Sequence, residues 1–286
     1  MDQRIIDLYD RFTHGQISRR DFMERLAGLA GSAAAAAALL PVLSNNYAQA
    51  ALVAEDDPRL VVERTTYKGE DGEIRAYLAR PTHGPEKLPA VIVIHENRGL
   101  NPHIEDVTRR LALEGFLALG PDLLSPLGGT PSDEDQARDL IAKLDTDKTV
   151  ANLVAAIGYL ASHGNSTGKV GAVGFCWGGF KVNQLASASP ELAAGVAYYG
   201  RQIPAEQVAT IRAPLLLHYA GIDENVNAGI DAYKAALDAA GKAYELHMYE
   251  GANHAFNTDT NAPRYNKEAA DLAWGRTVAF LKKSLA

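Results

Sequence analysis

The sequence predicts an α/β fold, with a mostly parallel central sheet covered by helices on both faces and an antiparallel hairpin at its start. Three observations predict it. Apolar segments of strand type alternate with segments of helical spacing through most of the chain. The segment 90–95 is a continuous apolar run, which is typical of a strand buried on both faces. Two short strand-like runs at 61–67 and 74–79 are separated by a Gly-Glu-Asp-Gly segment at 69–72, which favours a hairpin.

The remaining elements follow along the chain in the order that such a sheet requires. Apolar residues at helical spacing predict a helix at 104–113, and Gly115 stands just past its last apolar position. The later elements are predicted as a strand at 116–119, a helical stretch at 133–163 broken near 145–146, strands at 170–173, 193–199 and 214–219, a helix at 226–240, a strand at 244–249 and a closing helix at 269–285. Ligand sites in such sheets lie at the carboxyl ends of the strands, so residues just past those ends are the candidates for function.

The composition excludes several classes of function. With 286 residues, 47% hydrophobic and 22% charged, the chain can bury a large core, and no composition shift within 51–286 marks a second domain. The formal net charge of −7 argues against a nucleic-acid partner, because binding a phosphate backbone needs clustered Lys and Arg. The single cysteine excludes an intramolecular disulfide, and the eight histidines lack metal-binding spacing. We therefore expect no metal and no organic cofactor.

Residues 1–50 look like an export signal. A pair of arginines lies within 18–24, an Ala-, Leu- and Gly-rich stretch follows at 26–43, and 48–50 reads Ala-Gln-Ala, as at a cleavage site. This pattern is similar to a twin-arginine signal. It predicts recognition by the twin-arginine export machinery, removal of the segment and a periplasmic protein without stable membrane insertion. The alternative is a membrane anchor, although Ala and Gly favour insertion only weakly. Residues 2–12 are expected to form a short amphipathic helix outside the fold.

The strongest chemical signal is a glycine-flanked cysteine between a predicted strand and a predicted helix. Gly174-Phe175-Cys176-Trp177-Gly178 has the G-x-nucleophile-x-G pattern of a sharp turn that presents its central side chain. At the start of a helix, the dipole and the free N–H groups favour a thiolate. The alternative is that Cys176 is a small buried hydrophobic residue in a glycine-rich turn.

An acid and a histidine follow the cysteine in the order of an α/β-hydrolase triad. Asp223 comes just after the strand at 214–219, and His254 lies in the loop after the strand at 244–249. In such a triad Asp223 would orient the imidazole of His254, which would activate Cys176. Each residue has a structural alternative: Asp223 as an Asx turn or N-cap of the next helix, and His254 as an exposed loop residue.

With these residues in place, the chain resembles the dienelactone hydrolase family (carboxymethylenebutenolidases) from about residue 61 to the C-terminus. The resemblance is carried by His95-Glu96-Asn97-Arg98-Gly99, Pro121-Asp122-Leu123, Gly174-Phe175-Cys176-Trp177-Gly178-Gly179, Asp223 and His254-Ala255-Phe256. It implies an α/β-hydrolase fold in which Glu96 pairs with the resting Cys176 and helps to form the thiolate. The alternative for Glu96 is a salt bridge with Arg98 or Arg75. The backbone N–H groups of Asn97 and Trp177 would form the oxyanion hole.

Two positions depart from the family pattern. Members that cleave dienelactones carry arginines that clamp the substrate carboxylate, where this chain has Pro126 and Thr258. Arginine suits that role because its planar fork binds a carboxylate through two hydrogen bonds. The candidates for substrate contacts in this chain are Arg98, Tyr199, Arg201 and Arg264.

The sequence therefore predicts a hydrolase that cleaves an ester or lactone of a small organic acid through Cys176, His254 and Asp223. Acyl transfer or thioester cleavage on the same triad is the enzymatic alternative. A ligand-binding or redox-sensing protein that keeps the fold and uses its lone thiol is the non-enzymatic alternative.

Overall fold

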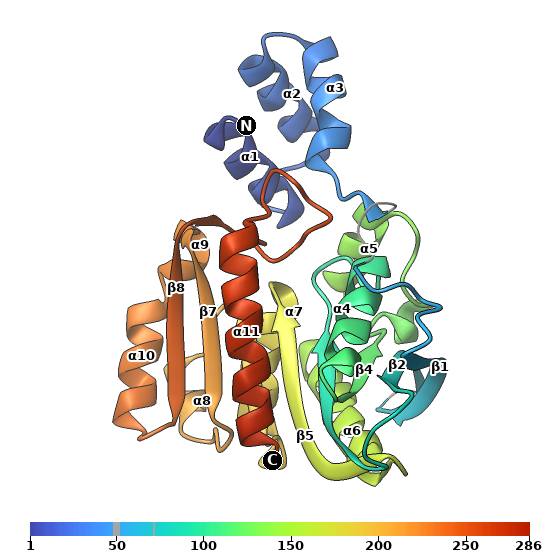
Figure 1. Ribbon diagram of the computed structural model, residues 1–286. Helices are drawn as coiled ribbons and strands as arrows, with labels where there is room; N and C mark the ends of the chain where they lie inside the picture. Colours follow the sequence, from blue (N-terminus) through green and yellow to red (C-terminus); the bar gives the residue numbers. More distant parts are fainter. Residues whose placement is uncertain (48–51, 71) are drawn as a thin grey trace.

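The computed structural model describes residues 1–47, 52–70 and 72–286, and its centre is one mixed sheet (Figure 1). The strands lie in the order β1-β2-β4-β3-β5-β6-β7-β8. β1 pairs with β2 and β2 with β4 in antiparallel fashion, and all neighbours from β4 to β8 are parallel. The strands are β1 (Leu60–Gly69), β2 (Gly72–Pro81), β3 (Leu88–Ile94), β4 (Leu117–Pro121), β5 (Ser166–Phe175), β6 (Ala194–Tyr198), β7 (Leu215–Ile222) and β8 (Tyr244–Asn253). The predicted α/β fold with an N-terminal antiparallel hairpin is confirmed.

Both faces of the sheet are covered by helices, because the central strands are apolar on both sides. In β3, Ile92 and Ile94 belong to one core, whereas Val91 and Val93 belong to the other. The helices on the first face are α6 (Thr146–Ser162), α7 (Trp177–Ala188) and α10 (Ile230–Ala239), and those on the second are α4 (Pro102–Leu113) and α11 (Lys267–Ser284). This arrangement leaves the carboxyl ends of β3, β5, β6, β7 and β8 at one common edge.

Two predicted helical stretches are each divided in the structure. The stretch at 133–163 forms α5 (Glu134–Ile141) and α6, and the side chain of Asp145 caps α6 by accepting from the N–H of Lys148. The stretch at 226–240 forms α9 (Glu224–Asn227) and α10. A short helix α8 (Ala205–Val208) and a 3₁₀ turn at Ser125–Leu127 complete the connections.

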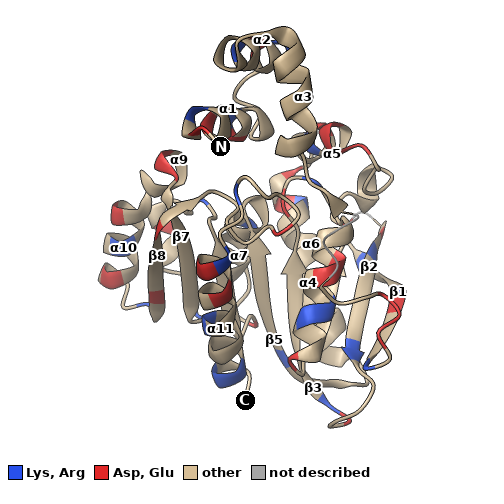
Figure 2. Cartoon of the chain, turned by 45° about the horizontal axis from the view of Figure 1, so that its top comes forward, with Lys and Arg blue, Asp and Glu red and all other residues tan. Residues whose placement is uncertain are grey.

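Three helices at the N-terminus form a small separate core above this edge of the sheet (Figure 1). They are α1 (Gln3–Thr13), α2 (Arg19–Ala30) and α3 (Ala33–Leu43). The Ala- and Leu-rich stretch is interrupted because Gly31 ends α2 with a φ of 86° and Ser32 caps α3. Seen with the top turned forward, α1 lies over the strand ends between α5 and α9 (Figure 2). The expectation that residues 2–12 lie outside the fold is wrong, since α1 contacts the hydrolase core directly.

The rest of the export prediction remains untested. The Ala-Gln-Ala site at 48–50 lies outside the described residues, as does Asp71 of the predicted Gly-Glu-Asp-Gly segment. In the described part of the chain no single helix is long and apolar enough to cross a membrane. Taken together, α2 and α3 meet that criterion of length and composition, but they are bent by 110° at their junction.

Candidate active site

Cys176 occupies a strained turn between β5 and α7. Its φ of 53° and ψ of −113° lie in a region that side-chain-bearing residues seldom adopt. The turn is possible because glycines allow close backbone contact: a Cβ on Gly174 would overlap the carbonyl of Gly178, and one on Gly178 would overlap the carbonyl of Ile94. The N–H of Cys176 donates to the carbonyl of Tyr198 at 2.9 Å. The cysteine side chain is thereby held at the N-terminus of α7.

Asp223 and His254 form a buried pair beside this turn. Oδ2 of Asp223 lies 2.6 Å from Nδ1 of His254, while Oδ1 accepts from the N–H of Val226 at 3.3 Å and caps α9. Asp223 therefore both contacts the histidine and caps α9, with one partner for each carboxylate oxygen, and its role as the acid of a triad stays a prediction. Nε2 of His254 has no hydrogen-bond partner among the described residues, and a nitrogen of this ring lies within 4.8 Å of Cys176 Sγ. The fold thus brings together the three residues predicted as a triad.

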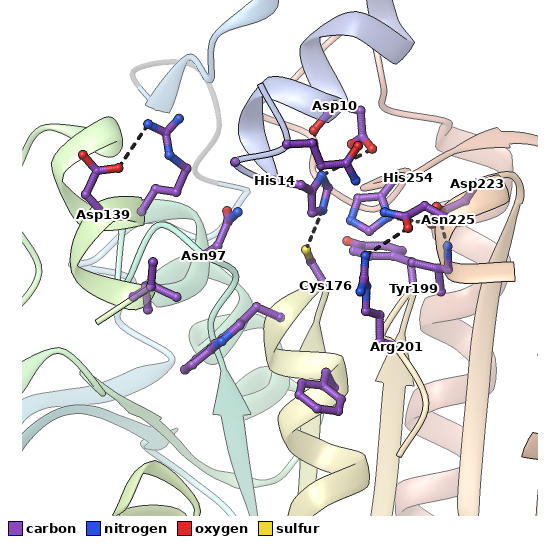
Figure 3. A pocket seen from close by; sticks show the side chains of 18 residues that line it. Asp10, His14, Asn97, Asp139, Cys176, Tyr199, Arg201, Asp223, Asn225 and His254 are labelled. Atoms are coloured by element: carbon purple, nitrogen blue, oxygen red, sulfur yellow. Dashed lines mark hydrogen bonds and ion pairs between the residues drawn. The ribbon is translucent and has the colours of Figure 1, made fainter. Parts of the chain in front are cut away.

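Helix α1 places a second imidazole against the sulfur (Figure 3). Nε2 of His14 lies 3.3 Å from Sγ of Cys176. Nδ1 of His14 lies 2.8 Å from the carbonyl oxygen of Asp10 and 3.3 Å from its carboxylate. The rings of His14 and His254 meet nearly at right angles, with centroids 4.6 Å apart. The sulfur therefore faces two imidazoles, each of which is held by a carboxylate.

The charges around Cys176 favour its thiolate. Burial raises the pKa of Cys176, but the positive charges of His254 and His14 outweigh burial and bring the pKa down to about 6. Burial lowers the pKa of His14, but the charge of Cys176 and the bond to Asp10 outweigh it and raise the pKa to about 10. Against burial, Asp223 and Cys176 hold the pKa of His254 well above its ordinary value. Because the cysteine is also partly exposed, it has the properties of a reactive thiol.

Glu96 lies buried in the loop after β3, close to the triad residues. Its Oε1 accepts a hydrogen bond from Oγ1 of Thr258 at 3.2 Å. Arg98 instead bonds to the carbonyl of Glu134, and Arg75 to the carbonyl of Gly128, so the described residues show no salt bridge from Glu96 to either arginine. The hydrogen-bond partner of the sulfur in this structure is His14, and pairing of Glu96 with Cys176 stays a prediction.

The predicted oxyanion-hole residues flank the sulfur from two elements. Trp177 is the first residue of α7, and its ring stacks on His95 with centroids 5.3 Å apart. Asn97 follows β3, and its side-chain Nδ2 donates to the carbonyl of Thr13 at the end of α1, at 2.7 Å. Both residues line the pocket, and the role of their N–H groups stays a prediction.

The sulfur opens into a cavity of about 530 Å³. Two arginines line this cavity. Arg201 donates to Oδ1 of Asn225 at 3.0 Å and has no carboxylate within ion-pair distance in the described part of the chain. Arg138, from α5, is paired with Asp135 at 3.1 Å and with Asp139 at 3.2 Å. Arg201 is therefore the cavity arginine whose charge is not balanced by a protein carboxylate.

The other predicted substrate contacts lie differently. Arg98 points to α5, where it lies 3.5 Å from the carboxylate of Asp135. Arg264 is buried and lies 3.6 Å from the carboxylate of Asp10. Tyr199 lines the cavity with its ring centroid 4.9 Å from that of His254. Of the four candidates, Tyr199 and Arg201 line the main cavity, whereas the two other arginines serve contacts within the protein.

Sequence reasoning missed His14, Asp10 and Arg138 as residues of the site. No motif surrounds His14, and the export interpretation removed the first helix from consideration. The spacing of Asp10 and His14, four residues apart on an amphipathic helix, was the available signal, because such residues share one face. Arg138 lies on a polar helix without any motif.

The described residues contain one group of side chains that could bind a metal ion. A nitrogen of His14, a nitrogen of His254 and Sγ of Cys176 lie within 4.8 Å of one another. A metal ion held there would occupy the sulfur of the predicted nucleophile and the two imidazoles that face it.

Comparison with known proteins shows the family of the chain. Residues 74–285 match the model of the dienelactone hydrolase family, and residues 1–31 match a second family described as YqhI-like. Proteins named "Putative carboxymethylenebutenolidase" are similar to this chain. The one from Escherichia coli O157:H7 is 32% identical over 247 residues, covering 81% of this chain and 90% of the relative. The one from Methylorubrum extorquens is 34% identical over 239 residues, covering 78% and 81%.

Solved structures give the same result. The crystal structure of a "Putative Dienelactone Hydrolase" from Klebsiella pneumoniae superposes with a TM-score of 0.72 at 30% identity, covering 78% of this chain and 99% of that protein. The family match at 74–285 includes strands β3 to β8, the cysteine turn and the loops that carry Asp223 and His254. The chain therefore belongs to the dienelactone hydrolase family and is a carboxymethylenebutenolidase-like hydrolase with the α/β-hydrolase fold.

Proposed function

We propose that this protein hydrolyses an ester or lactone of a small organic acid, with Cys176 as nucleophile. The thiolate attacks the carbonyl carbon, and the resulting oxyanion is held by the N–H groups of Asn97 and Trp177. His254, oriented by Asp223, gives a proton to the leaving oxygen and then takes one from the water that releases the acyl group. The products are an acid and an alcohol, or a hydroxy acid from a lactone.

One observation carries this proposal: the 2.6 Å pair of Asp223 and His254 faces a strained, partly exposed cysteine at a helix N-terminus. Because Nδ1 of His254 is engaged by Asp223, the orientation of the ring is fixed and its Nε2 is left free to exchange a proton with substrate, water or sulfur. The low thiol pKa supports a nucleophile rather than an inert core cysteine.

The test measures hydrolysis of a panel of aryl esters and lactones by Cys176→Ala and Cys176→Ser. We expect kcat/KM to fall at least about 1000-fold in the alanine variant, because the covalent route is lost. With substrate in excess, a pre-steady-state burst of one phenolate per active site is expected for the unmodified protein. An unchanged rate in Cys176→Ala would contradict the assignment of the nucleophile.

Export by the twin-arginine route is also a proposal. Its support is the arginine pair at Arg19 and Arg20, which is exposed at the start of α2. The partner would be the export machinery, and the compartment the periplasm. The double variant Arg19→Lys, Arg20→Lys should shift the protein to the cytoplasmic fraction of the cell. Equal periplasmic amounts of the two proteins would contradict this route.

A further inference from the structure

We propose that His14, positioned by Asp10 on helix α1, is a catalytic residue that stabilises the thiolate of Cys176, which makes the N-terminal helices a working part of the enzyme. The inference rests on the proposed function for the role of the thiolate. It assigns a residue to the centre that lies outside the matched hydrolase region, which begins at residue 74.

The first support is the arrangement around the sulfur. Nε2 of His14 lies 3.3 Å from Sγ of Cys176, and Nδ1 of the same ring contacts the carbonyl oxygen and the carboxylate of Asp10. His254 and Asp223, near the C-terminal end of the chain, form a second imidazole–carboxylate pair of the same kind. A charge-assisted hydrogen bond from an imidazolium to a thiolate is stronger than a neutral one. Helix α1 therefore offers a donor aimed at the reacting atom.

The second support is that α1 is bound to the loops that carry the other catalytic groups. Asn97, in the loop after β3, donates to the carbonyl of Thr13 at 2.7 Å. Gln3 donates to Oδ1 of Asn253, the residue before His254, at 2.5 Å. Arg264 lies 3.6 Å from Asp10. Because three separate contacts hold both ends of α1, the helix is built into the site.

The third support is that the other two N-terminal helices hold α1 in place. Tyr9 and Phe12 of α1 are buried against Phe22 and Leu26 of α2. The segment is also tied to the hydrolase core beyond α1, since Asn261 donates to the carbonyl of Leu43 at 2.7 Å. The three-helix core thus fixes the ring of His14 at the cavity wall.

The two imidazoles then have separate roles. When the thiolate attacks, an S–C bond forms and the carbonyl electron pair moves to oxygen. When the ester C–O bond breaks, the leaving oxygen takes its proton from His254. Water then gives a proton to His254 and attacks the thioester carbon, and the S–C bond breaks with its electron pair on sulfur. His14 keeps its proton throughout and stabilises the charge on Cys176 before the first step and after the last.

The pH behaviour of this centre depends on groups from several elements. α1 contributes Asp10 and His14, and the β7 and β8 ends contribute Asp223 and His254. The loop after β3 contributes Glu96, the end of β6 contributes Tyr199, and the segment before α11 contributes Arg264, which lies beside Asp10.

The experiment follows alkylation of the full chain by iodoacetamide against pH. Cys176 is the chain's single thiol, so the rate reports its ionisation directly and needs no substrate. We expect a midpoint near pH 6 in the unmodified protein. In His14→Gln the midpoint should rise by about 1–2 pH units, since an opposite charge at this distance shifts a pKa by about that much. His83→Gln, at an exposed turn, is the matched control and should leave the midpoint unchanged.

A second pair of variants tests the role of the carboxylate. Asp10→Asn should shift the alkylation midpoint in the same direction by a smaller amount, whereas Asp7→Asn, one turn away on α1 and exposed, should not. Ester hydrolysis by His14→Gln should fall about tenfold or more near pH 6.5 and recover as the pH rises past the new midpoint. A merely structural role would lower activity equally at every pH.

An unchanged alkylation midpoint in His14→Gln would overturn the inference. Faster ester hydrolysis by His14→Gln would also overturn it, because it would show that His14 blocks access to Cys176. If the unmodified chain hydrolysed none of the esters while His14→Gln still shifted the midpoint, the proposed function would fail and the thiolate contact would stand. Unchanged circular dichroism and melting temperature in Asp10→Asn would keep the test valid if His14→Gln folded poorly.

Discussion

Asp223 is placed to serve both the structure and the proposed chemistry, because its two oxygens have different partners. Oδ1 caps α9 through the N–H of Val226, and Oδ2 holds His254. Asp223→Asn keeps an N-cap but removes the charge that orients and stabilises the imidazole. We expect kcat to fall by on the order of 100-fold to 10,000-fold, with little change in melting temperature. Asp133→Asn, which caps α5 without contacting a histidine, is the control and should keep full activity.

The uncompensated charge of Arg201 predicts the preferred substrate. Among the described residues its Nη2 donates to the amide oxygen of Asn225 and the guanidinium has no ion pair, so it is available to a carboxylate in the cavity. Arg201→Gln should raise KM about tenfold for esters whose acid part carries a second carboxylate, because a hydrogen bond to a charged group is lost. Neutral esters of the same size should keep their KM, as should both substrates with Arg212→Gln on the surface. Equal effects on charged and neutral esters would contradict this role.

The shifted pKa values of the two groups at the sulfur predict a bell-shaped pH profile. The pKa of Cys176 is lowered to about 6, so the thiolate is present above that pH and is lost as the pH falls through it. The pKa of His14 is raised to about 10, so its positive charge is present below that pH and is lost as the pH rises through it. We expect kcat/KM to have an acid limb near pH 6 and an alkaline limb near pH 10, both belonging to the coupled group. A single rise near pH 9 would show an unperturbed thiol.

At the scale of elements, the site depends on the close contact between the β5–α7 turn and the end of β3. Gly178 lies against the backbone carbonyls of Ile94 and His95, and a flexible side chain could move aside where a carbonyl cannot. The contact sets the distance between the cysteine and the loop that carries Glu96 and Asn97. Its geometry is a property of two elements that are remote in sequence.

Gly178→Ala tests this contact. The added Cβ must push the end of β3 away, so we expect a loss of about 1–3 kcal/mol in the free energy of unfolding and a loss of most hydrolytic activity. Gly158→Ala is the control, because Gly158 lies in α6 with open space at its Cβ position. There alanine should be neutral or stabilise by about 0.5–1 kcal/mol. Equal stability of the two variants by urea unfolding would contradict the close contact.

At the scale of the whole molecule, the features that the sequence predicts are those that a local pattern of residues determines. The apolar run of β3, the glycines around Cys176 and the order of Asp223 and His254 each depend on a few neighbouring residues, and each led to the correct element or contact. The position of α1 depends instead on Asn97, Asn253 and Arg264, which lie far along the chain. Contacts between such distant residues leave no periodic signal, so the contact of His14 with Cys176 was out of reach of sequence patterns.

The contact of His14 with Cys176 makes the predicted removal of residues 1–50 incompatible with a catalytic role for His14. Cleavage after Ala50 would remove His14 together with α1, so a catalytic role for His14 requires that the segment remain attached to the active enzyme. We therefore expect active protein purified from cells to have the intact mass of the full chain, 30.6 kDa. The measurement is intact mass spectrometry of the cytoplasmic and periplasmic fractions, with ester hydrolysis assayed in each. Full activity in a species that begins at Ala51 would show that the hydrolase core works without its N-terminal helices, and a mixture in which only the longer species is active would show that those helices complete the site.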